Sequence, residues 1–114
     1  MSGTVLHLED GSWLELDGKG YLLDPARWTP RIAECMASQD GVNLTPDHWV
    51  ILHIFRDYFR RYDMEPPMRA LVKLAAEKLG TEKGNSRFLY QLFADGPVTQ
   101  ACRYAGLPRP VSCI

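Results

Sequence analysis

Prolines divide this chain into short segments, and several of them stand where a helix would begin. A threonine precedes the proline at 29–30 and again at 45–46, so a hydroxyl is available to cap a helix that starts with proline. Pro66-Pro67 and Gly96-Pro97 mark two further starts, because proline interrupts a helix but is tolerated in its first turn. From residue 29 onward the sequence therefore predicts a set of short helices.

Apolar residues recur within these segments at the spacing of a helical face. In the longest segment, Trp49, Leu52 and Phe55 are three residues apart, and further apolar residues widen the face, so this helix is expected near the centre of the fold. Gly80 and Gly106 suit helix ends. The predicted helices cover about residues 30–38, 46–62, 67–79, 86–93 and 97–105.

The N-terminal residues follow a different pattern. Segments 4–8 and 12–23 are predicted as short strands around turns, with Asp10-Gly11 and Asp17-Gly18 as hairpin signals. The expected fold class is mainly α, within the α+β class. The chain has 114 residues, the size of a single domain. We divide it into a β-hairpin region at about 1–24, a helical bundle at 29–105 and a C-terminal arm at 106–114.

The last eight residues contain two prolines, which exclude a regular helix and favour an extended arm. No apolar run has the length of a membrane span, and the start MSGTVLHLED lacks the features of a signal peptide. We therefore expect a cytoplasmic protein without membrane insertion. The net charge of −1 is unevenly distributed, with basic residues in excess over 51–114. That half is the more favourable place for an acidic partner or an anion, although such asymmetry also arises as ordinary scatter.

Three cysteines, at positions 35, 102 and 113, lack the spacing of a disulfide scaffold or a zinc site, and we expect no metal and no cofactor. Cys35 stands among apolar residues of a helix and is expected to pack in the core. Cys113, the second-last residue, is accessible on the arm, and accessibility together with thiolate character governs cysteine reactivity. Cys102 is either a structural helix residue or a second redox thiol onto which the arm can fold back.

The segment 67–93 has the pattern of a helix-turn-helix element, with two short helices around a turn that contains glycine. Basic side chains on it are available for phosphate groups, namely Arg69, Lys73, Lys78, Lys83 and Arg87. A solvated basic face explains the same residues. Direct binding of nucleic acid is therefore the least favoured of the activities that we consider.

A specific resemblance is carried by residues 96–114, GPVTQACRYAGLPRPVSCI, which look like the C-terminal arm of the DsrC/TusE family of sulfur-trafficking proteins. The stretch EKGNSRFLYQLF at 82–93 is similar to an internal block of that family, and the resemblance runs from about residue 13 to the end. It implies an N-terminal β-hairpin packed on an orthogonal helical bundle, with a helix-turn-helix-like element and a flexible C-terminal arm. The patterns above agree with this fold.

The resemblance also implies a chemistry. At the position of Cys113, members of the family accept sulfane sulfur as a persulfide and pass it to a partner protein, by the exchange reaction that makes and breaks disulfides. The chain is thus expected to be a sulfurtransferase that acts as a persulfide carrier rather than as a stand-alone catalyst. Arg103 and Arg109 are candidate docking charges for a partner.

The presence of Cys102 helps to distinguish between the two types of family member. DsrC-type members have a second arm cysteine at this position, work with dissimilatory sulfite reductase, and can join it to Cys113 in a disulfide. TusE-type members relay sulfur from a TusBCD-like complex to MnmA for 2-thiouridine synthesis in tRNA. We favour the DsrC type, keep the TusE type as the alternative, and keep a helix-turn-helix DNA-binding regulator as the second alternative. The expected donor is TusBCD- or DsrEFH-like, or rhodanese- or TusA-like; the acceptor is either dissimilatory sulfite reductase or MnmA with tRNA.

Overall fold

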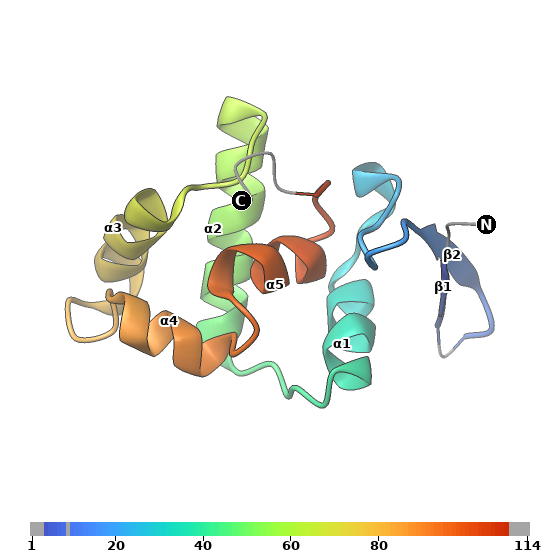
Figure 1. Cartoon of the computed structure of the whole chain (residues 1–114), viewed down its shortest axis with the longest axis horizontal. Coiled ribbons are helices and arrows are strands. Elements are labelled where there is room, and N and C mark those ends of the chain that lie inside the picture. Colours follow the sequence, from blue (N-terminus) through green and yellow to red (C-terminus); the bar gives the residue numbers. More distant parts are fainter. Residues whose placement is uncertain (1–3, 9, 110–114) are drawn as a thin grey trace.

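The threonine caps predicted at two helix starts are present in the computed structural model, which describes residues 4–8 and 10–109 (Figure 1). The Thr29 hydroxyl accepts a hydrogen bond from the Ile32 N–H, and the Thr45 hydroxyl accepts one from the His48 N–H. All five predicted helices are confirmed to within one residue at each end. In the described part of the chain they are α1 (Pro30–Gln39), α2 (Pro46–Tyr62), α3 (Met68–Leu79), α4 (Ser86–Leu92) and α5 (Pro97–Tyr104).

An antiparallel hairpin precedes the helices. Strand β1 covers Thr4–His7 and β2 covers Trp13–Leu16, with Leu6 opposite Leu14. Both of these leucines are buried, whereas Trp13, which points to the other face, is exposed. The hairpin therefore packs through one face only, and the fold class is confirmed as mainly α with a small β part.

Within the predicted strand segment 12–23, β2 ends at Leu16, where the predicted Asp17-Gly18 turn begins. The reason is Asp17, whose carboxylate accepts hydrogen bonds from the backbone N–H groups of Lys19 and Tyr21 and turns the chain. Leu22 then returns to form an isolated bridge with Leu16. A short 3-10 helix at 25–27, which is not among the predicted elements, leads from this turn into α1.

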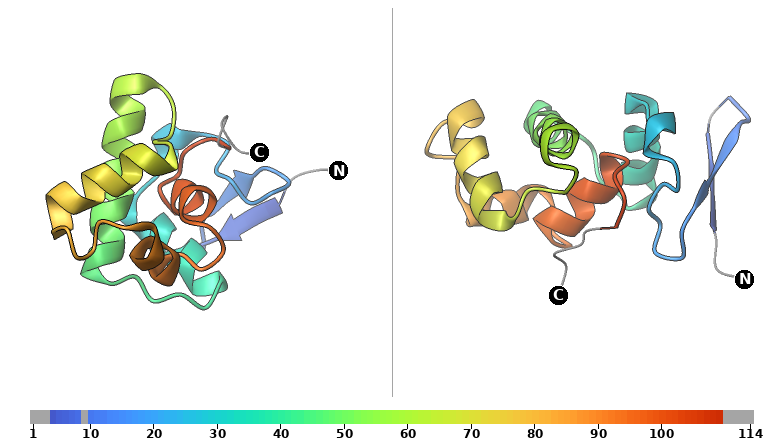
Figure 2. Two further views of the ribbon diagram at one scale, coloured as in Figure 1. Left: turned by 60° about the vertical axis from the view of Figure 1, so that its left-hand side comes forward. Right: turned by 90° about the horizontal axis from the view of Figure 1, so that it is seen from above.

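Helix α5 lies between α1 and α2, contacts both, and crosses α2 in Figure 1. Figure 2 shows α3 and α4 on the far side of α2 from the hairpin. Ala101, Cys102 and Tyr104 of α5 have no exposed surface, so the last helix of the described chain lies at the centre of the core. None of the helices in the described residues has the length and apolar character that crossing a membrane requires.

The predicted helix-turn-helix element corresponds to α3, α4 and the turn between them. A Cβ atom on Gly84 in that turn would lie 2.3 Å from the Cβ of Ala76, so the turn packs closely against α3. Lys83 forms an ion pair with Asp47 of α2 at 3.0 Å, and its ammonium lies 5.7 Å from the ring centroid of Phe88. This lysine, a candidate for phosphate binding from its sequence pattern, therefore takes part in contacts within the bundle.

Candidate functional site

The C-terminal end of α5 forms a tight turn that determines where the arm leaves the bundle. The Leu107 N–H donates to the Cys102 carbonyl at 3.1 Å, and the Gly106 N–H donates to the Arg103 carbonyl at 3.1 Å. These two bonds form a Schellman motif, and Gly106 has the positive φ of 74° that the motif requires. Leu107 is consequently buried, with 2% of its surface exposed, whereas Pro108 and Arg109 after it are exposed.

Cys102 lies under this turn and is fully buried. Its thiol donates a hydrogen bond to the carbonyl oxygen of Pro108 at an S–O distance of 3.2 Å. Burial, with a smaller contribution from the negative charge of Glu65, raises the pKa of the Cys102 thiol to about 12. The thiolate is the reactive form, so in this conformation Cys102 is a protonated and unreactive thiol.

Two side chains from distant segments bind the last carbonyl groups of α5. The indole N–H of Trp28 donates to the Tyr104 carbonyl at 2.8 Å, and Arg56 donates to the Ala105 carbonyl at 2.6 Å. The guanidinium carbon of Arg56 also lies 4.1 Å from the ring centroid of Trp28. The C-terminal carbonyls of a helix lack partners within the helix and carry partial negative charge, so a cation and an N–H donor stabilise this end of α5.

Gly106 allows Trp28 to approach the turn. A Cβ atom at position 106 would lie 2.3 Å from Cδ1 of the Trp28 ring, which is too close for any side chain. Glycine is therefore required here twice, for its backbone conformation and for the space that the indole occupies.

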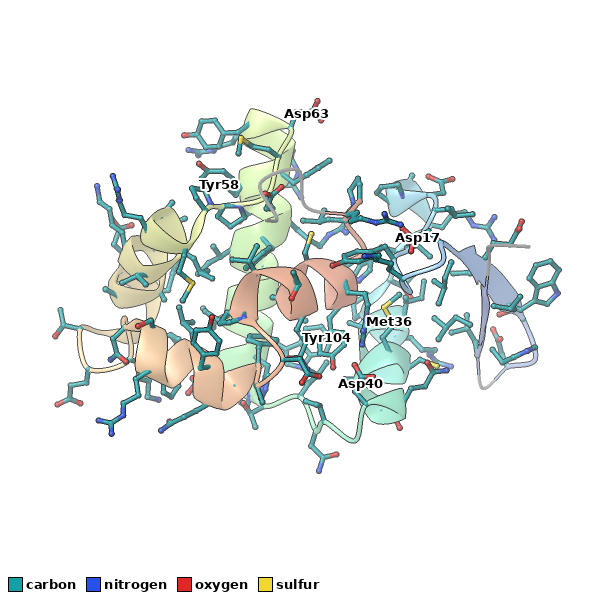
Figure 3. The ribbon with its side chains drawn as sticks, in the orientation of Figure 1. Asp17, Met36, Asp40, Tyr58, Asp63 and Tyr104 are labelled. Carbon is teal, nitrogen blue, oxygen red and sulfur yellow. The ribbon has the colours of Figure 1, made fainter. Side chains whose placement is uncertain are left out.

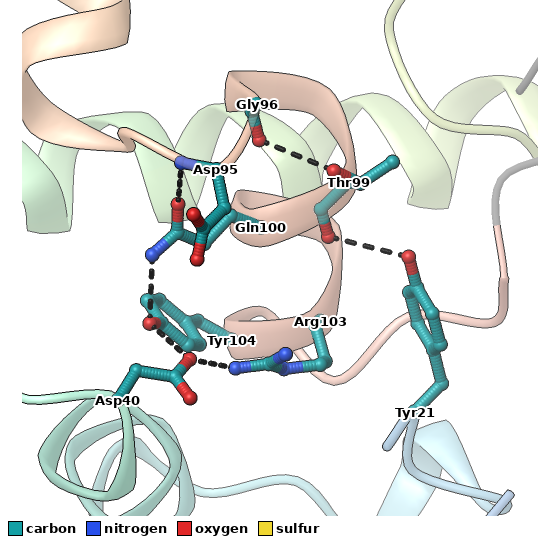
Figure 4. Close-up of polar contacts among 8 residues, drawn as sticks. All are labelled: Tyr21, Asp40, Asp95, Gly96, Thr99, Gln100, Arg103 and Tyr104. Carbon is teal, nitrogen blue, oxygen red and sulfur yellow. Dashed lines mark hydrogen bonds and ion pairs between the residues drawn. The ribbon is translucent and has the colours of Figure 1, made fainter. Parts of the chain in front are cut away.

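A polar network attaches α5 to the end of α1 (Figure 4). The Tyr104 hydroxyl donates to Asp40 at 2.7 Å and accepts a hydrogen bond from Gln100 at 2.9 Å, and Arg103 forms an ion pair with the same aspartate. Asp40 is the C-cap residue that follows α1. Arg103, a candidate docking charge from the sequence, therefore has a partner within the chain.

Arg109, the other candidate docking charge, forms an ion pair with Asp17 at 3.2 Å, and its side chain is 51% exposed. Partial burial opposes the ionisation of Asp17. Hydrogen bonds from the Tyr21 and Lys19 N–H groups, and the guanidinium of Arg109, outweigh that effect and hold the pKa of Asp17 below its usual 3.8. Asp17 and Asp40 lie on opposite sides of the C-terminal end of α5 in the view of Figure 3.

Cys113, the principal candidate from the sequence, lies outside the described residues. Its distance from the bundle is nevertheless limited by the chain, because five residue steps separate it from Pro108. At about 3.3–3.6 Å per residue the arm beyond Pro108 spans at most roughly 16–18 Å. Cys35 is half-buried against the core, and its thiol donates to the His7 carbonyl at 3.2 Å.

No cluster of three metal-ligating side chains occurs among residues 4–8 and 10–109. A cavity of about 650 Å³ opens between α2 and α3, but neither Cys102 nor the described residues of the arm line it. The candidate site is therefore the arm and the end of α5 rather than a pocket.

The site residues predicted from the sequence are Cys102, Cys113, Arg103 and Arg109, and they do not include Trp28 or Arg56. Neither residue carries a local signal, because each acts on a carbonyl group that is far away in the sequence. The turn itself had a signal. A glycine at a helix end followed by an apolar residue is typical of a Schellman motif, and it would have predicted that Leu107 is buried.

Comparisons with known proteins identify the family to which these features belong. The sequence matches the family described as DsrC like protein over residues 9–114. Sulfurtransferase TusE of Escherichia coli strain K12 is 44% identical over 105 residues, which are 92% of this chain and 96% of that protein. The NMR structure of Allochromatium vinosum DsrC has a TM-score of 0.87 at 43% identity, covering 98% of this chain and 99% of that one.

A second solved structure agrees. The crystal structure of the oxidized gamma-subunit of the dissimilatory sulfite reductase (DsrC) from Archaeoglobus fulgidus has a TM-score of 0.86 at 38% identity, and covers 97% of this chain and 100% of that one. The match in sequence includes the whole arm, and the match in structure includes nearly the whole chain. This chain belongs to the DsrC-like family.

Proposed function

We propose that this protein is a sulfur-relay protein in which Cys113 carries sulfane sulfur as a persulfide. The observation that carries the proposal is the family match, which extends over residues 9–114 and so includes Cys113 itself. Curated relatives that are 44% identical bear the name Sulfurtransferase TusE, which supports a role in sulfur transfer. The protein acts as a co-substrate that is loaded by one partner and unloaded by another.

In the loading step, the Cys113 thiolate attacks the terminal sulfur of a donor protein's cysteine persulfide. A bond forms between that sulfur and the Cys113 Sγ, the bond to the donor cysteine breaks, and the donor leaves as a thiolate. The sulfane sulfur changes its carrier, and no external oxidant or reductant is required. Because the step needs an accessible thiolate, it falls to Cys113 rather than to the buried Cys102.

Two unloading steps follow from the two arm cysteines. In the first, a nucleophile in the acceptor attacks the terminal sulfur and releases the Cys113 thiolate. In the second, the Cys102 thiolate attacks the Cys113 Sγ, a disulfide forms between the two cysteines, and the terminal sulfur leaves as hydrosulfide. The second step oxidises the two cysteine thiols to a disulfide and reduces the sulfane sulfur by the same two electrons.

We place the protein in the DsrC type, with a dissimilatory sulfite reductase-like acceptor, because it has both Cys102 and Cys113. A TusE-type relay from a TusBCD-like complex to MnmA and tRNA is the alternative, favoured by the curated relatives named TusE. The donor is TusBCD-, DsrEFH-, rhodanese- or TusA-like in either case, and the location is cytoplasmic. Arg109 is the better docking residue of the two arginines, because about half of its side chain is exposed.

Mass spectrometry tests the loading step. The full-length protein is incubated with glutathione persulfide, and the expected product is heavier by one sulfur atom, located on the peptide that contains Cys113. A Cys35→Ser variant is the matched control, because it removes a thiol but leaves the arm intact, and it should be loaded normally. An adduct that persists in Cys113→Ser, or no adduct at all, would contradict the assignment.

Affinity capture separates the two types. A Cys113 mixed disulfide, trapped in the source cell, should retain either a sulfite reductase-like protein or a tRNA-thiolating enzyme. Mild oxidation of the purified chain then tests Cys102, since the DsrC type predicts a bridge between Cys102 and Cys113. A bridge that includes Cys35 would show that Cys102 has no such role.

A further inference from the structure

The residues that follow α5 cover the Cys102 thiol, and we call residues 105–109 the strap. After the Schellman turn the chain runs back over α5, so that the Pro108 carbonyl meets the thiol at 3.2 Å. Leu107, within the strap, is inserted into the core. With this cover in place, Cys102 has no exposed surface.

The strap is held differently at its two ends. At the start, Arg56 donates a charged hydrogen bond to the Ala105 carbonyl at 2.6 Å in a partly buried position. At the end, Arg109 is held by the surface ion pair with Asp17, which belongs to a turn 92 residues earlier in the sequence. Surface ion pairs contribute little and are screened by salt, so the end of the strap is the part that separates first.

This cover is incompatible with the second unloading step as long as the strap is in place. Disulfide formation requires direct contact of two sulfur atoms and Cα atoms about 4.4–6.8 Å apart. The Cys102 Sγ is enclosed by core side chains and by the Pro108 carbonyl. The arm beyond Pro108 is long enough for Cys113 to return, so the cover rather than the distance prevents the reaction.

We propose that the strap is a gate on Cys102, which reacts with Cys113 only after residues 107–109 have lifted from the bundle, and that Asp17 is a positioning residue that keeps the gate closed through Arg109. An acidic partner surface that binds Arg109 competes with Asp17 and thereby opens the gate. Docking of an acceptor is in this way coupled to release of the second thiol. The gate rests on the two-thiol form of the proposed function, but its opening can be measured without Cys113.

The test uses the full-length chain with Cys35→Ser and Cys113→Ser, in which Cys102 is the single remaining thiol. The rate at which N-ethylmaleimide labels Cys102 under native conditions reports the opening of the strap. Asp17→Asn removes the charge, while the asparagine side chain still accepts the backbone hydrogen bonds of the turn. Asp47→Asn is the matched control, because it removes a similarly exposed carboxylate from an ion pair whose partner, Lys83, lies in the turn between α3 and α4.

At low salt we expect Asp17→Asn to raise the labelling rate by up to about five-fold, the change that a surface ion pair makes in an equilibrium constant. Added salt should reduce the difference, and Asp47→Asn should label at the parent rate. Equal rates in Asp17→Asn and Asp47→Asn would overturn the role of Asp17. Circular dichroism measures how global unfolding depends on urea concentration. If the labelling rate of Cys102 depends on urea as steeply, the gate itself is overturned. Because Cys113 is absent, neither result depends on whether persulfide loading occurs.

Discussion

Gly106 offers a sharp test of how the end of α5 is built, through the substitution Gly106→Ala. Its φ of 74° places an alanine in the left-handed region, which costs roughly 1–2 kcal/mol. The new Cβ would also lie 2.3 Å from the Trp28 ring, so the indole must move away from the Tyr104 carbonyl. Forced displacement in a packed region costs about 1–3 kcal/mol.

Gly41→Ala is the matched control for this substitution. Gly41 has nearly the same φ, 76°, but an added Cβ meets nothing within 4 Å, so only the backbone cost applies. Both changes restrict the unfolded chain equally, and that contribution cancels in the comparison. We therefore expect Gly106→Ala to lose roughly 2 kcal/mol more stability than Gly41→Ala.

Thermal unfolding followed by circular dichroism measures the difference. In a domain of this size, roughly 2 kcal/mol corresponds to a melting temperature about 8–12 °C lower. If the two variants melt together, the contact between Trp28 and the turn contributes nothing. The description of the arm's attachment would then be wrong.

Three further predictions concern stability. Arg56→Met should lower the free energy of unfolding, measured with urea, by about 2 kcal/mol, because a charged hydrogen bond to the Ala105 carbonyl disappears. An unchanged urea midpoint would contradict this. Gly84→Ala should lower the free energy of unfolding by about 1–3 kcal/mol in the same assay, because its Cβ, in the turn between α3 and α4, would meet Ala76 of α3. A neutral effect would refute that packing. Asp17 has a lowered pKa when folded, so its contribution to stability is present above the unfolded pKa, near 3.8, and is lost as the pH falls through the lower folded value. The free energy of unfolding of Asp17→Asn should therefore fall less steeply below pH 4 than that of the parent. Parallel plots of this free energy against pH would exclude the role of Asp17.

The helices were predictable because their signals are local. Each threonine that precedes a proline lies within three residues of the backbone N–H that it caps, so sequence order alone indicates the contact. The end of β2 is also local in origin. The Asp17-Gly18 signal indicated a turn correctly, but not that the side chain of Asp17 would hold that turn and end β2.

The attachment of the arm was not predictable in the same way. Trp28 binds a carbonyl 76 residues away, and Arg56 binds one 49 residues away, so no window of sequence contains both partners. The cover over Cys102 depends on these contacts and on the burial of Leu107. Sequence spacing left open whether Cys102 is structural or reactive. The structure shows the thiol buried under the strap, and the proposed gate would let the same thiol react once the strap has lifted.

The central position of α5 also has a consequence for synthesis. The chain emerges from the ribosome N-terminus first, so α1 to α4 are complete before the helix that fills the space between α1 and α2 exists. The contact from Tyr104 to Asp40 joins residues 64 positions apart and forms only at that late stage. Until then Cys102 is a solvated thiol, whereas afterwards it is sealed under the strap. The same helix thus leaves Cys102 open to oxidants in the newborn chain and protects it in the folded protein.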